Sequence, residues 1–209
     1  MRFTGLTIFV LIFVILIFLI GAFTRTYNAL QIMDEDVNSK WAQVTNQLKR
    51  RSDLIPNLVE TVRGYAEHES QVFSEVAQAR AKLSGAINQG NIKNVQTSTN
   101  ELNTALGRLL AIAENYPQLK SNEQFRILSD ELAGTENRIA VARMDYNNSV
   151  QKLNSQIRVF PTAIIASILN IKQRDYFDVN EAELNTPKVD FTNNPSQTQP
   201  MIEQTNTVR

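Results

Sequence analysis

The chain has 209 residues, a length typical of one domain, and its 21 basic residues balance its 21 acidic ones. A nucleic-acid-binding protein would normally show a basic excess, so that class is not indicated. The absence of cysteine excludes disulfides, thiol catalysis and zinc–thiolate sites. With only 7 glycines and 6 prolines, the composition favours long helices over a β-protein with many tight turns.

The first segment is uncharged from Phe3 to Thr24, and residues 6–23 are almost entirely Leu, Ile, Val and Phe. A run of roughly 20 apolar residues is long enough to cross a bilayer as a helix. A cleaved signal peptide would have a shorter apolar core and a better cleavage site than Ile20-Gly21-Ala22. We therefore expect residues 1–24 to be a retained transmembrane anchor that contacts membrane lipid.

The charges beside this segment bear on its orientation. Arg2 lies before it and Arg25 after it, so the counts of basic residues nearly tie. The short N-terminal flank with Arg2 favours an N-terminus inside the cytoplasm. The rest of the chain would then face outward.

Two apolar rows with alternating spacings of three and four residues predict long helices after the anchor. The first row runs from Trp41 to Ala86 and includes the charged residues Arg51 and Glu69. Residues 89–91 (QGN) form a predicted turn. The second row runs from Ile92 to Tyr116, where the following proline disfavours helical geometry.

A third and very regular row runs from Phe125 to Phe160, after a helix start at Ser121-Asn122. A helix of this extent would be roughly 55 Å long and needs a partner of similar length to bury its apolar stripe, for which the first stretch is the natural candidate. The predicted fold class is all-α: an N-terminal transmembrane helix followed by an elongated antiparallel bundle of three to four long helices over residues 25–178. Residues 179–209, rich in Thr, Asn, Gln, Pro and Ser, are expected to be a disordered tail.

Residues 162–178 differ from the rows before them, because a short apolar patch from Ile164 to Ile171 is followed by polar residues. This segment is expected to form a small helix that caps the bundle. Alternatively, it touches the membrane surface or a second subunit.

Residues 47–69 (QLKRRSDLIPNLVETVRGYAEHE) combine basic and acidic residues with a proline. Pro56 has no N–H, and its ring collides with the carbonyl of Ser52 four residues earlier. A helix arriving from Trp41 must therefore kink there or stop and restart, and both Ser52 and Asp53 are good N-cap residues. The apolar row keeps its phase across the junction, which favours a kink.

Arg51 falls on the apolar row, and a buried arginine needs a carboxylate partner. If the first and third helices are antiparallel, the candidate partners are Asp130, Glu131 and Glu136, and the ion pair would fix the helix register. The alternative is an anion or lipid-headgroup site built by Lys49, Arg50 and Arg51. Further along, Glu136, Asn137 and Arg138 follow Gly134 and are predicted to form a polar layer between closely packed helices.

Recognisable enzyme motifs are missing from the sequence. The single histidine, His68, cannot supply the paired Glu-x-x-His ligands of a di-iron bundle, and HESQV lacks the second histidine of the zinc pattern H-E-x-x-H. There is no G-x-S-x-G, Walker A or G-x-G-x-x-G motif. We predict a protein that is not an enzyme and has no cofactor or metal.

An ordered series of motifs resembles the LemA family of bacterial membrane-anchored helical proteins. The resemblance covers most of the chain from Tyr27 to Phe177 and departs at Asn170-Ile171, where the family usually has Gly-Phe. It implies an anchored helical bundle in the bacterial inner membrane, with no established catalytic residues, and some relatives belong to magnetosome membranes. The matching stretches are Tyr27-Asn28, Trp41–Val44, Gln47–Arg51, Asp53–Glu60, Gly64–Glu69, Ala79-Arg80, Leu109–Pro117, Leu119-Lys120, Glu131-Leu132, Thr135–Ala140, Ala142-Arg143, Tyr146-Asn147, Phe160-Pro161 and Tyr176-Phe177.

The leading hypothesis is a single-pass membrane protein whose bundle is an interaction or assembly module in membrane organisation. A protein partner or a second copy is expected, because an anchor concentrates copies in one plane. The alternative is a membrane-tethered sensor or ligand-binding module for an anion or lipid headgroup. The residues singled out for structural or interaction roles are Trp41, Lys49, Arg50, Arg51, Asp53, Pro56, Asn57, Glu60, Glu136, Asn137 and Arg138.

Overall fold

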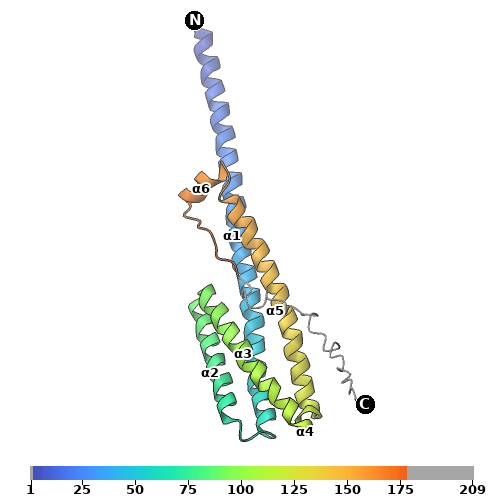
Figure 1. Ribbon diagram of the computed structural model, residues 1–209. Coiled ribbons are helices and arrows are strands. Elements are labelled where there is room, and N and C mark those ends of the chain that lie inside the picture. The colour runs from blue at the N-terminus through green and yellow to red at the C-terminus, as the bar shows by residue number, and fades with distance from the viewer. Residues whose placement is uncertain (1, 178–209) are drawn as a thin grey trace, which may run out of the picture. The chain divides into compact units, whose positions relative to one another are not determined.

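The computed structural model describes residues 2–177, and this range is helical apart from its connections and the segment 169–177 that follows the last helix (Figure 1). The elements in this range are all helices, so the all-α fold class is confirmed. The expected polar tail, residues 179–209, lies outside the described residues. In chain order the helices are α1 (Arg2–Arg63), α2 (Ser70–Gln89), α3 (Ile92–Asn115), α4 (Pro117–Lys120), α5 (Glu123–Gln156) and α6 (Thr162–Ile168).

Helix α1 joins the apolar segment to the bundle without a break. It has 62 residues, and at 1.5 Å per residue it is about 93 Å long. Among the described helices, it is the one whose length and apolar composition suit a membrane crossing, and its apolar window is not buried by other parts of the protein. The residues that follow this window on the same helix pack into the bundle core.

The first apolar row proved to be two helices, which corrects the single stretch expected from Trp41 to Ala86. Helix α1 ends at Arg63, and the chain turns through residues 64–69 before α2 begins. The carbonyl of Val62 accepts hydrogen bonds from the amides of both Tyr65 and Ala66, at 3.0 Å each, and Tyr65 is exposed. The heptad-like spacing continues across this turn because the two helices each bury one face, so spacing alone did not reveal the break.

Two antiparallel helix pairs make up the bundle. Ion pairs join Lys40 to Asp145 at 3.7 Å and Arg50 to Glu131 at 3.2 Å, so residue numbers fall along α5 as they rise along α1. The second pair has the same pattern, because Glu75 bonds to Arg108 and Lys82 to Glu101, at 2.7 Å each. The expected partnership of the first and third rows is thus the α1–α5 pair.

The third predicted row is buried along nearly its whole length, from Phe125 to Leu153. The prediction is wrong for the last residues of the row, because α5 ends at Gln156 and Phe160 is 81% exposed. The turn between α2 and α3 is built as predicted, since Gly90 has the left-handed φ of 69° and the side chain of Asn91 caps α3. Helix α6 lies beside the C-terminal end of the apolar segment of α1 (Figure 1).

Candidate functional site

Arg51 is the centre of a polar contact among three helices. Its side chain is 10% exposed, and its guanidinium forms an ion pair with Glu136 of α5 and donates a hydrogen bond to Oδ1 of Asn103 of α3 at 2.8 Å. Burial lowers the pKa of Arg51, while the charge and hydrogen bond of Glu136 oppose this change. An arginine pKa is high enough that the group remains charged. Glu136 is one of the three carboxylates named from the sequence.

Pro56 lies inside α1, and the helix neither stops nor restarts there. Because Pro56 has no N–H, the carbonyl of Ser52 lacks its usual donor four residues later. Arg80 of α2 supplies the missing bond: its Nε donates to the Ser52 oxygen at 2.9 Å. The proline therefore creates a buried acceptor that connects α1 to α2.

The other polar residues expected between 49 and 60 do not converge on one site. Arg50 pairs with Glu131 at 3.2 Å and Glu60 with Arg63 at 2.9 Å, both at exposed positions. Lys49, Asp53 and Asn57 are exposed. Successive residues of a helix point about 100° apart, so Lys49, Arg50 and Arg51 face three directions. Two of these three cations are already paired with carboxylates, and the geometry does not assemble an anion site from them.

Trp41 packs in an aromatic cluster where the end of the described chain returns to the bundle. Its ring centroid lies 5.4 Å from that of Tyr146 and 6.1 Å from that of Phe177. The Arg143 guanidinium lies 4.5 Å above the Phe177 ring. Burial raises the pKa of Tyr146 to about 12, with a smaller lowering contribution from Arg174 and a raising one from Asp175. The Tyr146 hydroxyl donates to the Asp175 carbonyl at 2.8 Å.

The returning segment, residues 171–177, is held by two asparagines of α5, and we call it the strap. Asn154 bonds both the N–H and the C=O of Arg174 at 2.9 Å, and Asn147 does the same for Phe177 at 2.8 and 2.9 Å. An asparagine amide can satisfy both backbone groups because it carries a donor and an acceptor. The Arg174 guanidinium also donates a hydrogen bond from Nη2 to Oδ1 of Asp34 of α1 at 2.8 Å. The strap was not predicted from the sequence, although two asparagines seven residues apart share one helical face.

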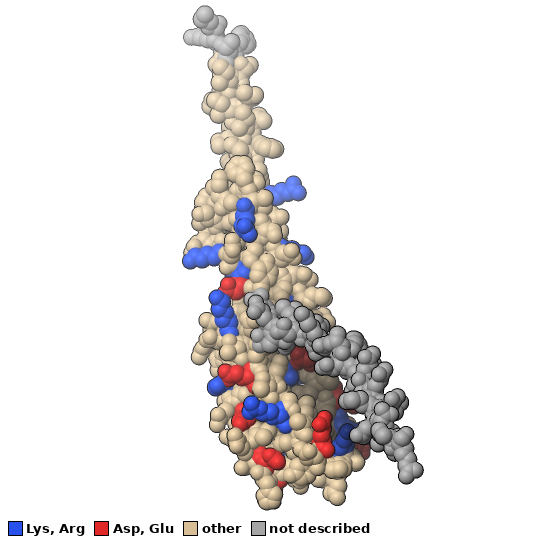
Figure 2. Space-filling view, in the orientation of Figure 1, with Lys and Arg blue, Asp and Glu red and all other residues tan. Residues whose placement is uncertain are grey.

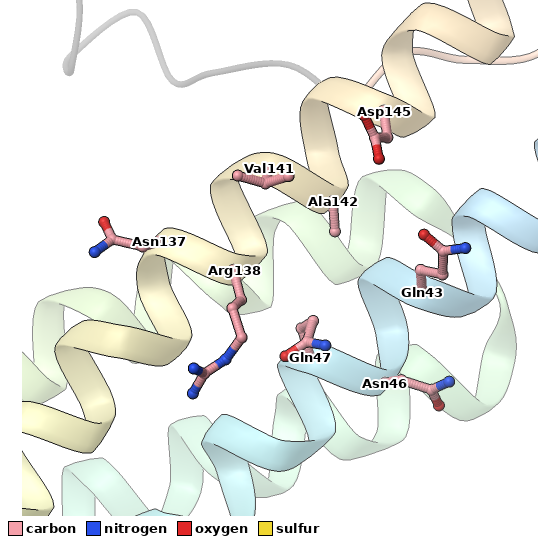
Figure 3. A pocket seen from close by; sticks show the side chains of 8 residues that line it. All are labelled: Gln43, Asn46, Gln47, Asn137, Arg138, Val141, Ala142 and Asp145. Carbon is pink, nitrogen blue, oxygen red and sulfur yellow. The ribbon is translucent and has the colours of Figure 1, made fainter.

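A groove of about 490 Å³ lies between α1 and α5, and we call it the open groove (Figure 3). The side chains of Arg138 and Gln47 lie between the two helices, whereas Asn137 and Asn46 point away from the groove. The Oε1 atom of Gln47 is buried and has no hydrogen-bond partner among residues 2–177. No carboxylate in that range pairs with Arg138. The lining residues are Gln43, Asn46, Gln47, Asn137, Arg138, Val141, Ala142 and Asp145.

The open groove lies on the side of the α1–α5 pair opposite the strap. Along α1, Trp41 faces the strap, and Gln43 is two residues, or about 200°, further around the helix. Along α5, Asn147 holds the strap, and Asp145 is again two residues away. Helices α2 and α3 lie behind the groove in Figure 3. The Lys40–Asp145 and Arg50–Glu131 ion pairs lie near its two ends.

Another kind of candidate site in the described part of the chain would be a cluster of metal-binding side chains. No group of three or more His, Asp or Glu side chains that could hold a metal ion occurs there. His68 is exposed in the turn between α1 and α2.

These features define a class of protein: an all-helical bundle continuous with one long apolar helix, with polar contacts between helices and a groove along one helix pair. The chain matches the model of the LemA family over residues 40–191 and belongs to that family. The resemblance inferred from the sequence is therefore confirmed. The chain is a membrane-associated helical protein by its family and its apolar helix.

The chain is also similar to individual members. Magnetosome protein MamQ 2 of Paramagnetospirillum magneticum is 28% identical over 186 residues, covering 78% of this chain and 68% of that protein. Magnetosome protein MamQ of Magnetospirillum gryphiswaldense is 28% identical over 174 residues, covering 72% and 64%. Protein LemA of Metamycoplasma hominis is 27% identical over 183 residues, covering 84% and 80%. None of these three is named for an enzymatic activity.

Proposed function

We propose that this protein is a non-enzymatic assembly module, anchored in a bacterial inner membrane by residues 1–24, whose bundle binds protein partners through the open groove. The observation that carries the proposal is the asymmetry of the α1–α5 pair. One side is covered by the α2–α3 pair and the strap, whereas the other carries a groove with an unpaired Arg138 and a buried, unbonded Gln47 oxygen among residues 2–177.

The chemistry of the groove suits a helix or loop that presents an acidic side chain and an amide or hydroxyl donor. An acidic side chain would pair with Arg138, and a donor would satisfy the Gln47 oxygen, whose burial without a bond is unfavourable. The exposed Val141 adds apolar contact area beside these polar groups. A second copy of the chain is the first partner to test, because a membrane anchor raises the effective concentration of copies in a plane.

The names of two relatives as magnetosome proteins support an assembly role at a membrane for this chain by analogy. The family's fold alone does not define an activity. The proposed function is therefore tested at the open groove.

Crosslinking in native membranes tests the proposal, and the lack of cysteine in the chain makes single-cysteine variants simple to interpret. Val141→Cys places a thiol beside the open groove, and Leu110→Cys places one at an exposed apolar position on α3 as the matched control. We expect a bismaleimide to link Val141→Cys to itself or to one recurrent protein, and Leu110→Cys to yield neither. Equal crosslinking of both variants, or none at position 141, would contradict the proposal.

A second candidate function is the binding of a small anion. Arg138 in the open groove is a better candidate for holding the anion than the Lys49–Arg51 stretch, because Arg50 and Arg51 are already paired with carboxylates. Inorganic phosphate and glycerol 3-phosphate are suitable probes in a thermal-shift titration of the full chain. A stabilisation that is lost in Arg138→Gln and kept in Arg126→Gln, an exposed arginine of the same helix, would support this function. If neither probe shifts the melting temperature, anion binding is rejected and assembly is the remaining candidate function.

We also propose that the N-terminus lies in the cytoplasm and the bundle outside it. A membrane-impermeant maleimide should then label Ser121→Cys in intact cells, since Ser121 is exposed at the α4–α5 turn. Labelling that requires cell lysis would reverse the assignment.

A further inference from the structure

The connection between α5 and α6, together with the short helix α6, carries a concentrated apolar surface. Val159, Phe160, Ile164 and Ile168 are 52%, 81%, 56% and 67% exposed, and α6 (TAIIASI) contains no charge. The opposite face of α6, with Ile165 and Ala166, is buried. A helix that is apolar on both faces is typical of a buried or membrane-contacting element rather than one that faces water.

This surface lies beside the apolar part of α1. Pro161 and Ile165 line an apolar groove of about 450 Å³ together with residues of α1 between Leu19 and Thr26. Leu19 is six residues before Arg25, the first charge after the apolar run, and thus about 9 Å from it along the helix. Interfacial helices insert their apolar face about 5–10 Å into the boundary between headgroups and acyl chains. The position of α6 beside α1 matches that depth.

The charges nearest to this surface along the sequence are basic. The sequence has no Asp or Glu between Asp145 and Asp175, and none before Asp34. Arg25, Arg158 and Lys172 are exposed, and we call them the basic belt. Figure 2 shows blue side chains, without red ones, directly below the uncharged part of the protein on the visible face. Such a distribution is complementary to anionic phospholipid headgroups.

We propose that Phe160 and α6 form a second membrane-contacting element, which lies in the interfacial layer of an anionic bilayer with the basic belt at the headgroups. The inference rests on the proposed membrane crossing of α1, but it does not depend on the open groove. Lipid fits this surface better than a second copy does. A symmetric contact would bring each basic residue of one copy toward the equivalent residues of the other, with no acidic residue from 146 to 174 to compensate.

Spin labelling of the full chain in phosphatidylcholine vesicles, with and without phosphatidylglycerol, tests the proposal. Labels are placed at Ile164→Cys and Ile168→Cys, with Ile127→Cys as a similarly exposed control on the bundle and Leu11→Cys as a reporter of the crossing. We expect the labels at 164 and 168 to be accessible to oxygen and protected from a water-soluble nickel complex, and the label at 127 to show the reverse.

The outcomes separate the inference from the anchor. Nickel access at 164 and 168 with protection at Leu11 would overturn the inference and keep the anchor, whereas nickel access at Leu11 would overturn both. Spin–spin broadening at 164 that disappears on dilution with unlabelled protein would assign the surface to a second copy instead.

The role of the basic belt has its own test. We expect phosphatidylglycerol to increase the protection of the label at 164 several-fold, and the paired substitutions Arg158→Gln and Lys172→Gln to remove this increase, because each base near an anionic surface contributes roughly fivefold in affinity. Lys49→Gln and Arg126→Gln, two exposed bases of the bundle, form the control pair. Equal protection with and without phosphatidylglycerol in the parent chain would overturn the charge complementarity.

Discussion

Arg51 and Glu136 form an ion pair whose two members are not equally buried. The side chain of Arg51 is 10% exposed and that of Glu136 is 42% exposed. Removing Glu136 leaves a buried guanidinium with Asn103 as its remaining partner, whereas removing Arg51 leaves a carboxylate that water can reach. The cost of losing each partner is therefore unequal, because the penalty follows the burial of the charge that stays.

Glu136→Ala should destabilise the protein by about 3 kcal/mol and lower its Tm by about 6–12 °C. Arg51→Met keeps the apolar stem of the side chain and should cost less than about half as much. Thermal unfolding of the full chain in detergent micelles, followed by circular dichroism, measures both. Glu131→Ala is the control and should cost at most about 1 kcal/mol, since its ion pair with Arg50 is exposed. Equal losses for Glu136→Ala and Arg51→Met would refute the argument.

Tyr146 gives the protein a dependence on alkaline pH. Its pKa is raised to about 12 in the fold, while an unperturbed tyrosine titrates near about 10. The stabilisation from the neutral phenol is therefore complete below about pH 10 and lost as the pH rises to about 12, with a magnitude on the order of 2 kcal/mol. In urea unfolding at increasing pH, the difference in free energy between parent and Tyr146→Phe should shrink over this range. A difference in free energy that stays constant over this range would contradict the prediction.

At the scale of elements, a backbone defect in one helix serves as the docking point for another. Pro56 deprives the Ser52 carbonyl of its helical donor, and Arg80 of α2 replaces that donor. The two residues should therefore be energetically coupled, because a residue with an N–H at position 56 would satisfy the carbonyl without Arg80.

A double-mutant cycle measures this coupling. Arg80→Leu should destabilise the parent by about 1–3 kcal/mol, because it leaves a buried carbonyl unbonded. The same substitution in a Pro56→Ala background should cost at least about 1 kcal/mol less. Lys82→Leu, two residues along α2, is the control and should behave alike in both backgrounds. Identical effects of Arg80→Leu with and without Pro56 would show that the bond has no such role.

The strap depends on side-chain amides rather than on a helix or sheet. Asn147→Ala removes both bonds to Phe177 and should loosen residues 171–177 without unfolding the bundle. Limited trypsin digestion should then cut after Lys172 several-fold faster than in the parent, because cleavage requires local opening. Asn148→Ala, at the exposed neighbouring position, should leave the rate unchanged. A rate that is equally unaffected in both variants would mean that the amide bonds do not hold the strap.

Periodic patterns predicted the helices well, and non-periodic contacts were beyond their reach. The row from Phe125 to Leu153 is buried as expected, because a 3.6-residue repeat directly reports which face is apolar. The turn at Gly64 escaped detection, since the spacing of apolar residues continues from Val62 to Val76 across it. The Asn147–Phe177 contact joins residues 30 apart in sequence, and nothing local to either residue specifies the other.

At the scale of the whole described chain, charged residues are distributed unevenly along the length of the protein. The part of α1 between Leu19 and Thr26, together with α6, is apolar, and the basic belt is nearest to it along the sequence. In the bundle below it, acidic and basic residues alternate and form ion pairs. This division could be predicted only in part from the sequence, which marked residues 162–171 as apolar but left their surroundings open. The structure places Pro161 and Ile165 beside the apolar run, and the proposed bilayer contact follows from that placement.

Because α1 is one continuous helix, a tilt of its apolar end would displace its other end. From Thr24 to Arg63 the helix extends about 58 Å beyond the apolar run, with no loop between them to absorb a rotation. If the anchor tilts by about 10° to match a bilayer of different thickness, the far end of a rigid α1 moves about 10 Å sideways. Changes in membrane thickness or curvature would thus be converted into displacement of the α1–α2 turn, and any partner bound along the bundle would experience that motion.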